Sequence, residues 1–500
     1  METGPGAPTP PIPLAGGAAD ATARGTARTV EVGDDLVRRL RDVCAEVVQD
    51  PEVLGESSRD WWPLAMTWAL EGELPGRASA VARPETAQQV ADVLAVCNEA
   101  QVPVTAAAGR SGVCGASVPL HGGVVLDLCA LTGIVDVDDT SLVVDVRPGT
   151  FGDRFEAELQ ESFGLTVGHW PQSMALSTVG GWLACRGAGQ YSTRYGKIED
   201  IVVGLDVALA DGRTLRTGGH PRQATGPDLN QLFVGSEGTL GIIPGARLAA
   251  HPVPHHQVRG AWSFPDFAAG LEASRRILRR GATPAVLRLY DGVESDRNYG
   301  VGTDRNVLLA LDEGDPYVVD GMWEVVRDEC RAGEALDVEL VEHWMQKRND
   351  VAALEQLITG GLVVDTMEVS GPWGVLPSVS RAAVDALLGV PGTLAASAHA
   401  SHSYLDGACL YFTFAGKPEP ASKDDFYRQV WDAGTRAVLA AGGSLSHHHG
   451  VGLNRSRYVA EALGGGLDVL AAVKAALDPN GILNPGKLGL GSSWGPPGLP

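Results

Sequence analysis

Three glycine-punctuated segments in a fixed order constrain the fold of this chain more than any other feature. They cover residues 106–117, 171–190 and 234–243. Glycines allow tight turns with positive φ, and successive amides in such turns form a concave nest for anionic oxygens such as a pyrophosphate. Each segment by itself is equally typical of an ordinary glycine-rich loop. Together they predict a backbone that wraps closely around a large planar ligand.

Composition excludes several classes of protein. The chain has 500 residues and a formal net charge of -22, which disfavours nucleic acid as a partner because a binder needs a basic face. The same charge allows at most transient contact with an anionic membrane, and no apolar run is long enough to predict a membrane span. Seven dispersed cysteines without C-x-x-C pairs indicate reduced thiols and no zinc-type spacing. We therefore expect a cytoplasmic protein.

The order of apolar runs and turn residues predicts the domain organisation. Residues 1–30 are rich in Gly, Ala, Pro and Thr and are expected to be a disordered tail, as are residues 489–500. A helix is predicted over 34–49, within an N-terminal helical segment at 31–74. Residues 75–253 predict an α+β domain, and the Pro-rich stretch at 251–254 marks its end. Beyond it, residues 254–488 predict a mixed or antiparallel sheet flanked by helices.

At the glycine-rich segments the chain resembles a known family. The order A-x-x-G-R-S-G, P-Q-S…S-T-V-G-G-W and G-S-E-G-T-L-G is similar to the FAD-binding domain of the vanillyl-alcohol oxidase (PCMH) type. The segment DPNGILNPGK at 478–487 resembles the closing segment of flavin oxidases with that domain. This resemblance implies an α+β fold in which a two-subdomain FAD-binding domain precedes a C-terminal substrate (cap) domain.

Two later stretches resemble the alkyldihydroxyacetonephosphate synthase branch of that family. They are SHSYLDGACLYFTF at 401–414 and GGSLSHHHGVG at 442–452. The resemblance implies that FAD binds non-covalently, because no histidine occupies the pyrophosphate loop. It implies the following FAD contacts: Ala106, Ala107, Ala108, Gly109, Arg110, Ser111, Gly112, Gln172, Ser173, Ser177, Thr178, Gly187, Ala188, Gly189, Gln190, Glu237, Gly238, Thr239, Leu240, Gly241, Ile242 and Ile243.

The same resemblance implies the catalytic groups. The family's proton-handling tyrosine falls on Tyr404, and its histidine cluster falls on His447, His448 and His449. A buried structural tyrosine and a solvated histidine loop are the alternative interpretations. If the histidines lie on a strand, at most two of them share the pocket, and we favour His448 with one neighbour.

The cation that binds the substrate phosphate is less well defined by the sequence. At the spacing expected upstream of DTMEVSGPW, no arginine occurs, and Arg348 lies several positions further upstream. Arg288 is a second candidate. His402 is a further candidate for a substrate contact.

A rival branch of the family binds a metal ion. The flavin dehydrogenases of D-2-hydroxy acids carry a G-H-x-G-D-G-N-x-H signature. In this chain Ala408 replaces the asparagine of that signature and Tyr411 its second histidine. Because one imidazole ligand is lost, we expect no metal.

The sequence is compatible with two functions. The resemblance implies an enzyme that exchanges the acyl group of acyl-dihydroxyacetone phosphate for a fatty alcohol through a flavin adduct, without net redox change. The alternative is an FAD-linked oxidoreductase of a 2-hydroxy acid or another alcohol. A non-catalytic FAD-binding protein is the least favoured class, because it does not explain why Tyr404 and the histidine cluster accompany an intact flavin domain. The expected partners are a small-molecule or lipid-like substrate and, by analogy, a second copy in a homodimer.

Overall fold

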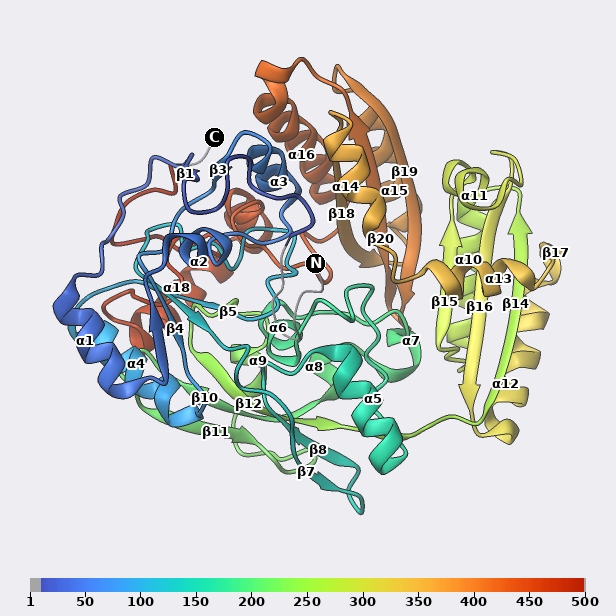
Figure 1. Ribbon diagram of the computed structural model, residues 1–500. Coiled ribbons are helices and arrows are strands. Elements are labelled where there is room, and N and C mark those ends of the chain that lie inside the picture. The colour runs from blue at the N-terminus through green and yellow to red at the C-terminus, as the bar shows by residue number, and fades with distance from the viewer. Residues whose placement is uncertain (1–9, 499–500) are drawn as a thin grey trace.

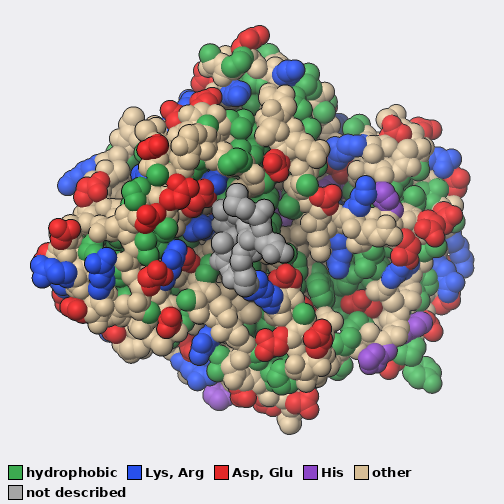
Figure 2. Space-filling view, viewed as in Figure 1, with side chains coloured by type: hydrophobic (Ala, Val, Ile, Leu, Met, Phe, Trp, Pro, Cys, Tyr) green, Lys and Arg blue, Asp and Glu red, His purple; other side chains and the backbone are tan. Residues whose placement is uncertain are grey.

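Three larger β-sheets and their flanking helices form the chain, and the computed structural model describes residues 10–498. In Figure 1 the first two sheets lie together in the blue and green part of the chain, and the third sheet, in yellow and orange, stands beside them. Within residues 10–498, no helix has both the length and the apolar character needed to cross a membrane. Figure 2 shows acidic side chains scattered over the viewed face with basic side chains between them.

The first sheet has four strands in the order β2-β4-β6-β5. Its strands β4, β6 and β5 are parallel, and β2 is antiparallel to β4. Helix α4 covers it, and the apolar positions Val90, Val93, Leu94 and Cys97 face the core as the sequence predicts. The predicted N-cap of α4 is also confirmed, because the Thr86 side chain accepts a hydrogen bond from the Gln89 amide. The elements are β2 Glu46–Val48, β4 Ala80–Arg83, β5 Val104–Ala107, β6 Val124–Asp127, α1 Asp34–Val43, α2 Pro51–Glu56, α3 Pro63–Ala69 and α4 Ala87–Glu99.

The second sheet has five antiparallel strands in the order β11-β10-β12-β8-β7. Short helices connect its strands and carry much of the glycine-rich sequence. The elements are β7 Ile134–Asp138, β8 Val143–Val146, β10 Val202–Ala208, β11 Thr214–Gly218, β12 Ile242–Ala249, α5 Gly152–Phe163, α6 Val179–Cys185, α7 Ser192–Tyr195, α8 Ile198–Ile201 and α9 Asn230–Phe233. Two small pairs join β1 Thr22–Ala23 to β3 Glu73–Leu74 and β9 Leu165–Thr166 to β13 His251–Pro252.

The third sheet has seven antiparallel strands in the order β17-β14-β16-β15-β19-β20-β18. Strands β15 and β19 are joined only by the pairs Leu289↔Ala400 and Tyr290↔His399, so the centre of the sheet is its narrowest seam. The strands are β14 His256–Phe264, β15 Val286–Tyr290, β16 Asn306–Gly314, β17 Glu334–Leu336, β18 Val363–Pro372, β19 Thr393–Ser403 and β20 Gly407–Gly416. The helices are α10 Phe267–Arg279, α11 Gly292–Tyr299, α12 Pro316–Glu329, α13 Glu339–Lys347, α14 Ala352–Thr359, α15 Leu376–Leu388 and α16 Lys423–Ala440.

After the third sheet the chain returns to the first. Helices α17 Val459–Leu463 and α18 Gly466–Leu477 lead to a segment that packs into the core of the first sheet through Ile482 and Leu483. The amide of Val104 on β5 donates to the carbonyl of Ile482, and the amide of Asn484 donates to the carbonyl of Val104. The first sheet is therefore completed by residues almost 400 positions later in the chain.

Two sequence-based expectations about the N-terminal region are corrected. The helix expected over 34–49 ends at Val43, because the β-branched residues Val47 and Val48 form strand β2 beside β4. The tail expected to be disordered over 1–30 is ordered from residue 10, since Ile12 and Leu14 are buried. Residues 1–9 lie outside the described part of the chain.

The C-terminal tail expected at 489–500 is also packed as far as residue 498. Leu490 is buried, Trp494 packs against the core of the first sheet, and the Gly498 carbonyl accepts a hydrogen bond from the Thr26 amide. Residues 499–500 lie outside the described part.

We expect the substitution Ile12→Ala to lower the free energy of unfolding by about 2–4 kcal/mol, because it leaves a cavity beside Met66, Leu74 and Ile358. Urea unfolding followed by tryptophan fluorescence measures the change. Val469→Ala, at a position that is 66% exposed, is the matched control and should change the midpoint little. Equal midpoints for the two variants would show that the N-terminal segment does not pack as described.

Candidate functional site

A cavity of about 860 Å³ lies where the glycine-rich segments meet the third sheet. All three segments contribute to its wall, and strands β15, β18, β19 and β20 contribute from the other side. A volume of this size is ample for a large cofactor with part of a substrate, since ligand pockets usually measure about 300–1,000 Å³.

The glycines of the wall fit the close approach that a flavin dinucleotide requires. A Cβ atom on Gly109 would overlap the carbonyl oxygen of Leu176, so the first and second segments touch backbone to backbone. Glu237 and Gly238 both have positive φ, at 49° and 72°, in the turn that the third segment contributes. Such turns direct amides towards a common point, as a pyrophosphate site needs.

Most residues that the resemblance assigns to FAD line this cavity. They are Ala106, Ala107, Ala108, Gly109, Arg110, Ser111, Gly112, Gln172, Ser173, Ser177, Thr178, Gly187, Ala188, Gln190, Glu237, Gly238, Gly241, Ile242 and Ile243.

Three assigned residues lie behind the wall. Gly189 packs against the backbone of Trp170, where a Cβ would overlap the Trp170 amide nitrogen. The Thr239 hydroxyl donates to the Ser236 carbonyl at 2.7 Å, and the Leu240 side chain lies in the core of the second sheet. None of the three is among the residues that line the cavity.

Glu237 connects the cofactor side of the cavity to the loop that follows the histidines. Its buried carboxylate accepts hydrogen bonds from the amides of Val451, at 2.5 Å, and Gly452, at 2.8 Å. Burial raises the pKa of this carboxyl group, and the two amides oppose that shift. The Asn484 side chain donates to the Glu237 carbonyl at 2.7 Å. One residue therefore ties three distant segments together.

The three consecutive histidines lie in a loop and not on a strand. His448 and His449 line the cavity, whereas His447 lies behind them and is not one of the lining residues. Burial lowers the pKa of all three, to about 4 for His449, so the imidazoles are neutral at physiological pH.

The buried carboxylate of Glu368 holds this loop in place. It accepts hydrogen bonds from the amides of His447, His448 and His449, and from Arg455 at 2.9 Å. Although burial acts to raise the pKa of Glu368, the Arg455 guanidinium holds that pKa well below its usual range. Sequence reasoning missed both residues, because a lone Glu on one strand and an Arg in a distant loop give no local signal.

Tyr404 and Tyr411 have different surroundings. The Tyr404 hydroxyl bonds to Ser192 Oγ at 3.1 Å and to His447 Nε2 at 3.0 Å, and Tyr404 is not one of the cavity-lining residues. Tyr411 on β20 does line the cavity, and its hydroxyl donates to Thr366 Oγ1 at 3.0 Å. Its ring stacks on His399 and lies beside His448 and His449.

The position of Tyr411 gives it the better access to a substrate. Tyr404 lies in the turn between β19 and β20, whereas Tyr411 lies within β20 and faces the cavity. Burial raises the pKa of the Tyr411 phenol, so it stays protonated. The expectation that Tyr411 replaces the second histidine of the rival signature is corrected, because the position two residues after Ala408 is Leu410, which is buried in the core.

Both candidate arginines line the cavity. The Arg288 guanidinium donates hydrogen bonds to Tyr290 Oη at 2.6 Å and to His399 Nε2 at 2.7 Å. The other ring nitrogen, His399 Nδ1, bonds to the Glu294 carboxylate at 2.7 Å. Burial lowers the pKa of His399 to about 4, which leaves its Nε2 free to accept from the guanidinium.

Arg348 lies over aromatic rings of the same wall. Its guanidinium is 5.7 Å from the Trp170 ring, 5.0 Å from the Tyr191 ring and 5.8 Å from the Trp344 ring. Such contacts orient a cation without neutralising it, so Arg348 keeps its charge available for an anionic substrate.

We expect Gly109→Ala to weaken FAD binding by at least about tenfold, because the added methyl group separates the first and second segments. Flavin content after purification and titration with FAD measure the loss. Gly321→Ala is the matched control, since a Cβ at Gly321 meets no atom within 4 Å. Unchanged flavin affinity in Gly109→Ala would contradict the proposed position of the cofactor.

The chain matches two described protein families. Residues 78–218 match the FAD binding domain, and residues 253–488 match the C-terminal domain of FAD linked oxidases.

Curated relatives with different names are similar to most of the chain. An uncharacterized FAD-linked oxidoreductase, YgcU of Escherichia coli K12, is 31% identical over 82% of this chain and 88% of its own. The glycolate oxidase subunit GlcD of Bacillus subtilis is 27% identical over 90% and 97%. Alkyldihydroxyacetonephosphate synthase of Dictyostelium discoideum is 28% identical over 83% and 74%.

Solved structures show the same fold. A structure of alkyldihydroxyacetonephosphate synthase aligns with a TM-score of 0.75 at 23% identity, covering 92% of this chain and 87% of the other. p-Cresol methylhydroxylase with substrate bound aligns with a TM-score of 0.71 at 18% identity, covering 93% and 99%. The predicted α+β fold, with an FAD-binding domain of the PCMH type and a C-terminal domain, is confirmed.

Proposed function

Since this chain belongs to the FAD-linked oxidases and takes FAD as its cofactor, we propose that it exchanges the acyl group of an acyl-dihydroxyacetone phosphate for a fatty alcohol. The products are the alkyl ether and a fatty acid, and the exchange involves no net redox change. The observation that carries this proposal is the joint presence of Tyr411, two neutral histidines and two arginines around one cavity.

The charged and apolar parts of the cavity suit the two ends of such a substrate. Arg288 and Arg348 offer planar guanidinium groups for a phosphate monoester. Apolar side chains of α14 and of the residue before it line another part of the wall, and these are Val351, Ala353, Leu354 and Leu357. This combination supports a lipid-like molecule with an anionic head.

The remaining groups supply proton transfer. His448 and His449 are neutral and accept a proton from the carbon beside the substrate ketone, while the protonated Tyr411 phenol donates one to a leaving oxygen. FAD supplies the electrophilic and hydride-accepting chemistry of its isoalloxazine ring when bound. We place the family's proton-handling tyrosine at Tyr411 in preference to Tyr404, because only Tyr411 lines the cavity.

A second candidate function is the oxidation of a 2-hydroxy acid. Its support is the similarity to the glycolate oxidase subunit, which extends over 97% of that relative. A carboxylate would pair with the same arginines, and a neutral histidine would accept the hydroxyl proton. The two functions differ in whether the flavin is reduced.

We expect purified protein to form an ether lipid from palmitoyl-dihydroxyacetone phosphate and labelled hexadecanol. Tyr411→Phe should lower this rate by at least about a hundredfold, because it removes the proton donor. Tyr317→Phe, at a position that is 92% exposed, is the control and should keep full activity. A larger loss in Tyr404→Phe than in Tyr411→Phe would contradict the assignment of the tyrosine.

Anaerobic mixing with D-lactate or glycolate separates the alternative. The proposed exchange predicts that the flavin absorbance stays unchanged in that experiment. Bleaching of the flavin together with no ether lipid would replace the proposal by the oxidoreductase function.

A further inference from the structure

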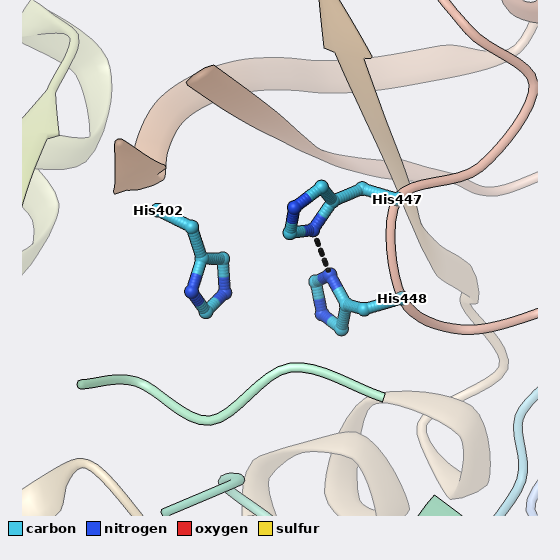
Figure 3. A group of neighbouring side chains, drawn as sticks. All are labelled: His402, His447 and His448. Carbon is cyan, nitrogen blue, oxygen red and sulfur yellow. Dashed lines mark hydrogen bonds between the residues drawn. The ribbon is translucent and has the colours of Figure 1, made fainter. Parts of the chain in front are cut away.

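Three imidazoles meet at the inner edge of the cavity, and two of them have no part in the proton transfer proposed above. His402 comes from the end of β19, and His447 and His448 come from the loop at 441–450. One ligand nitrogen from each lies within 4.8 Å of those of the other two, and His402 and His447 are buried. Figure 3 shows the three rings turned towards one another.

The outward nitrogens of two rings are held by a shared pair of hydroxyl groups. Ser192 Oγ bonds to His402 Nδ1 at 2.8 Å, and the Tyr404 hydroxyl bonds to His447 Nε2 at 3.0 Å. The two hydroxyls are themselves 3.1 Å apart. Metal-binding histidines almost always have such a partner on the second ring nitrogen, because it fixes the tautomer and the ring orientation.

These bonds leave His402 Nε2 and His447 Nδ1 for the space between the rings. His447 Nδ1 lies 2.9 Å from His448 Nδ1, so one of these nitrogens carries a proton and the lone pair of the other accepts it. A bound cation would displace that proton and take the place of the hydrogen bond. Nitrogen ligands of a tetrahedral zinc ion lie about 3.4 Å apart, given metal–nitrogen distances of about 2.0–2.1 Å. Modest side-chain rotations would therefore bring the three nitrogens to that spacing.

We infer that His402, His447 and His448 bind a divalent transition-metal ion of the zinc class. Three imidazoles with a fourth, open position are a ligand set that zinc uses in catalytic sites. Because His402 and His448 line the cavity, the fourth position faces the substrate side, where water or a substrate oxygen completes the coordination. With the ion bound, His448 serves as a ligand, and His449, which is not a ligand, is the histidine left to accept the proton in the function proposed above.

The charges around the cluster are compatible with a bound cation. Lys197 donates to the His447 carbonyl at 2.6 Å and is paired with Glu199 at 3.1 Å. Glu368, behind the loop, is paired with Arg455 at 2.9 Å. Lys197 and Arg455 are therefore each paired with a carboxylate, and Arg288 is a further cation whose charge acts on His402.

The ligand set also explains why the sequence led to the opposite expectation. The expectation of no metal depended on the signature of the rival branch, whose second histidine is missing from this chain. The structure brings His447 and His448 beside His402 from a loop some 45 residues later in the chain, which a local signature does not include. Three nitrogen ligands are therefore present although the second histidine of the signature is missing.

The test uses full-length protein without a histidine tag and with FAD bound. After treatment with a chelator, titration with Zn²⁺ alone should give one tightly bound equivalent per chain, measured by calorimetry and by elemental analysis after desalting. His402→Asn and His447→Asn should each lower the affinity at least about tenfold. His220→Asn, at an exposed position, is the control and should keep the full equivalent.

Further variants distinguish a metal site from a hydrogen-bonded histidine cluster. Tyr404→Phe removes only the outer partner of His447 and should still lower Zn²⁺ affinity about tenfold, with flavin content as the check on folding. If His402→Asn or His447→Asn fails to retain flavin, X-ray absorption at the zinc edge of the wild type should still report three nitrogen ligands from histidine. No bound zinc, or zinc retained equally by all the variants, would overturn the inference.

Discussion

The buried pair of Glu368 and Arg455 is the interaction on which the arrangement of the active cavity depends. Both side chains are fully buried, and the carboxylate also accepts the amides of three consecutive histidines. Breaking a buried pair by removing one partner typically costs about 3–5 kcal/mol, because an uncompensated charge stays behind. The pair therefore stabilises the observed position of the loop, in which His448 and His449 line the cavity and His447 does not.

The cavity is built by segments that are distant in sequence. Glu237 of the FAD-binding domain binds the loop after the histidines, and Asn484 binds the Glu237 carbonyl in turn. On the opposite side, Arg288 and His399 bond across the narrow seam between β15 and β19. Hydrogen bonds thus join the residues around the cofactor to the loop that carries the histidines, and other hydrogen bonds join the strands of the opposite wall.

Features set by neighbouring residues could be predicted from the sequence. Features that depend on distant segments meeting in the fold could not. The cap at Thr86 and the glycine at position 109 follow from short-range chemistry, since a hydroxyl caps a helix and a missing Cβ permits close backbone approach. The choice between Tyr404 and Tyr411 depends on where the turn before β20 lies, which the sequence does not define. The proximity of His402 to His447 depends on how the third sheet and the following loop fold together. The buried Ile12 was missed because a Pro- and Gly-rich composition hides single apolar anchors.

The return of the chain to its first sheet has a consequence for biosynthesis. Strand β5 shares backbone hydrogen bonds with Ile482 and Asn484, and Lys487 donates to the Val118 carbonyl beside the first glycine-rich segment. While the polypeptide is still emerging from the ribosome, the dinucleotide cradle lacks these partners, although most of its own residues have already been made. Contacts of such long sequence separation form late, because their loop-closure entropy must be met first. The dinucleotide cradle is therefore complete only after residues 482–487 have packed against it.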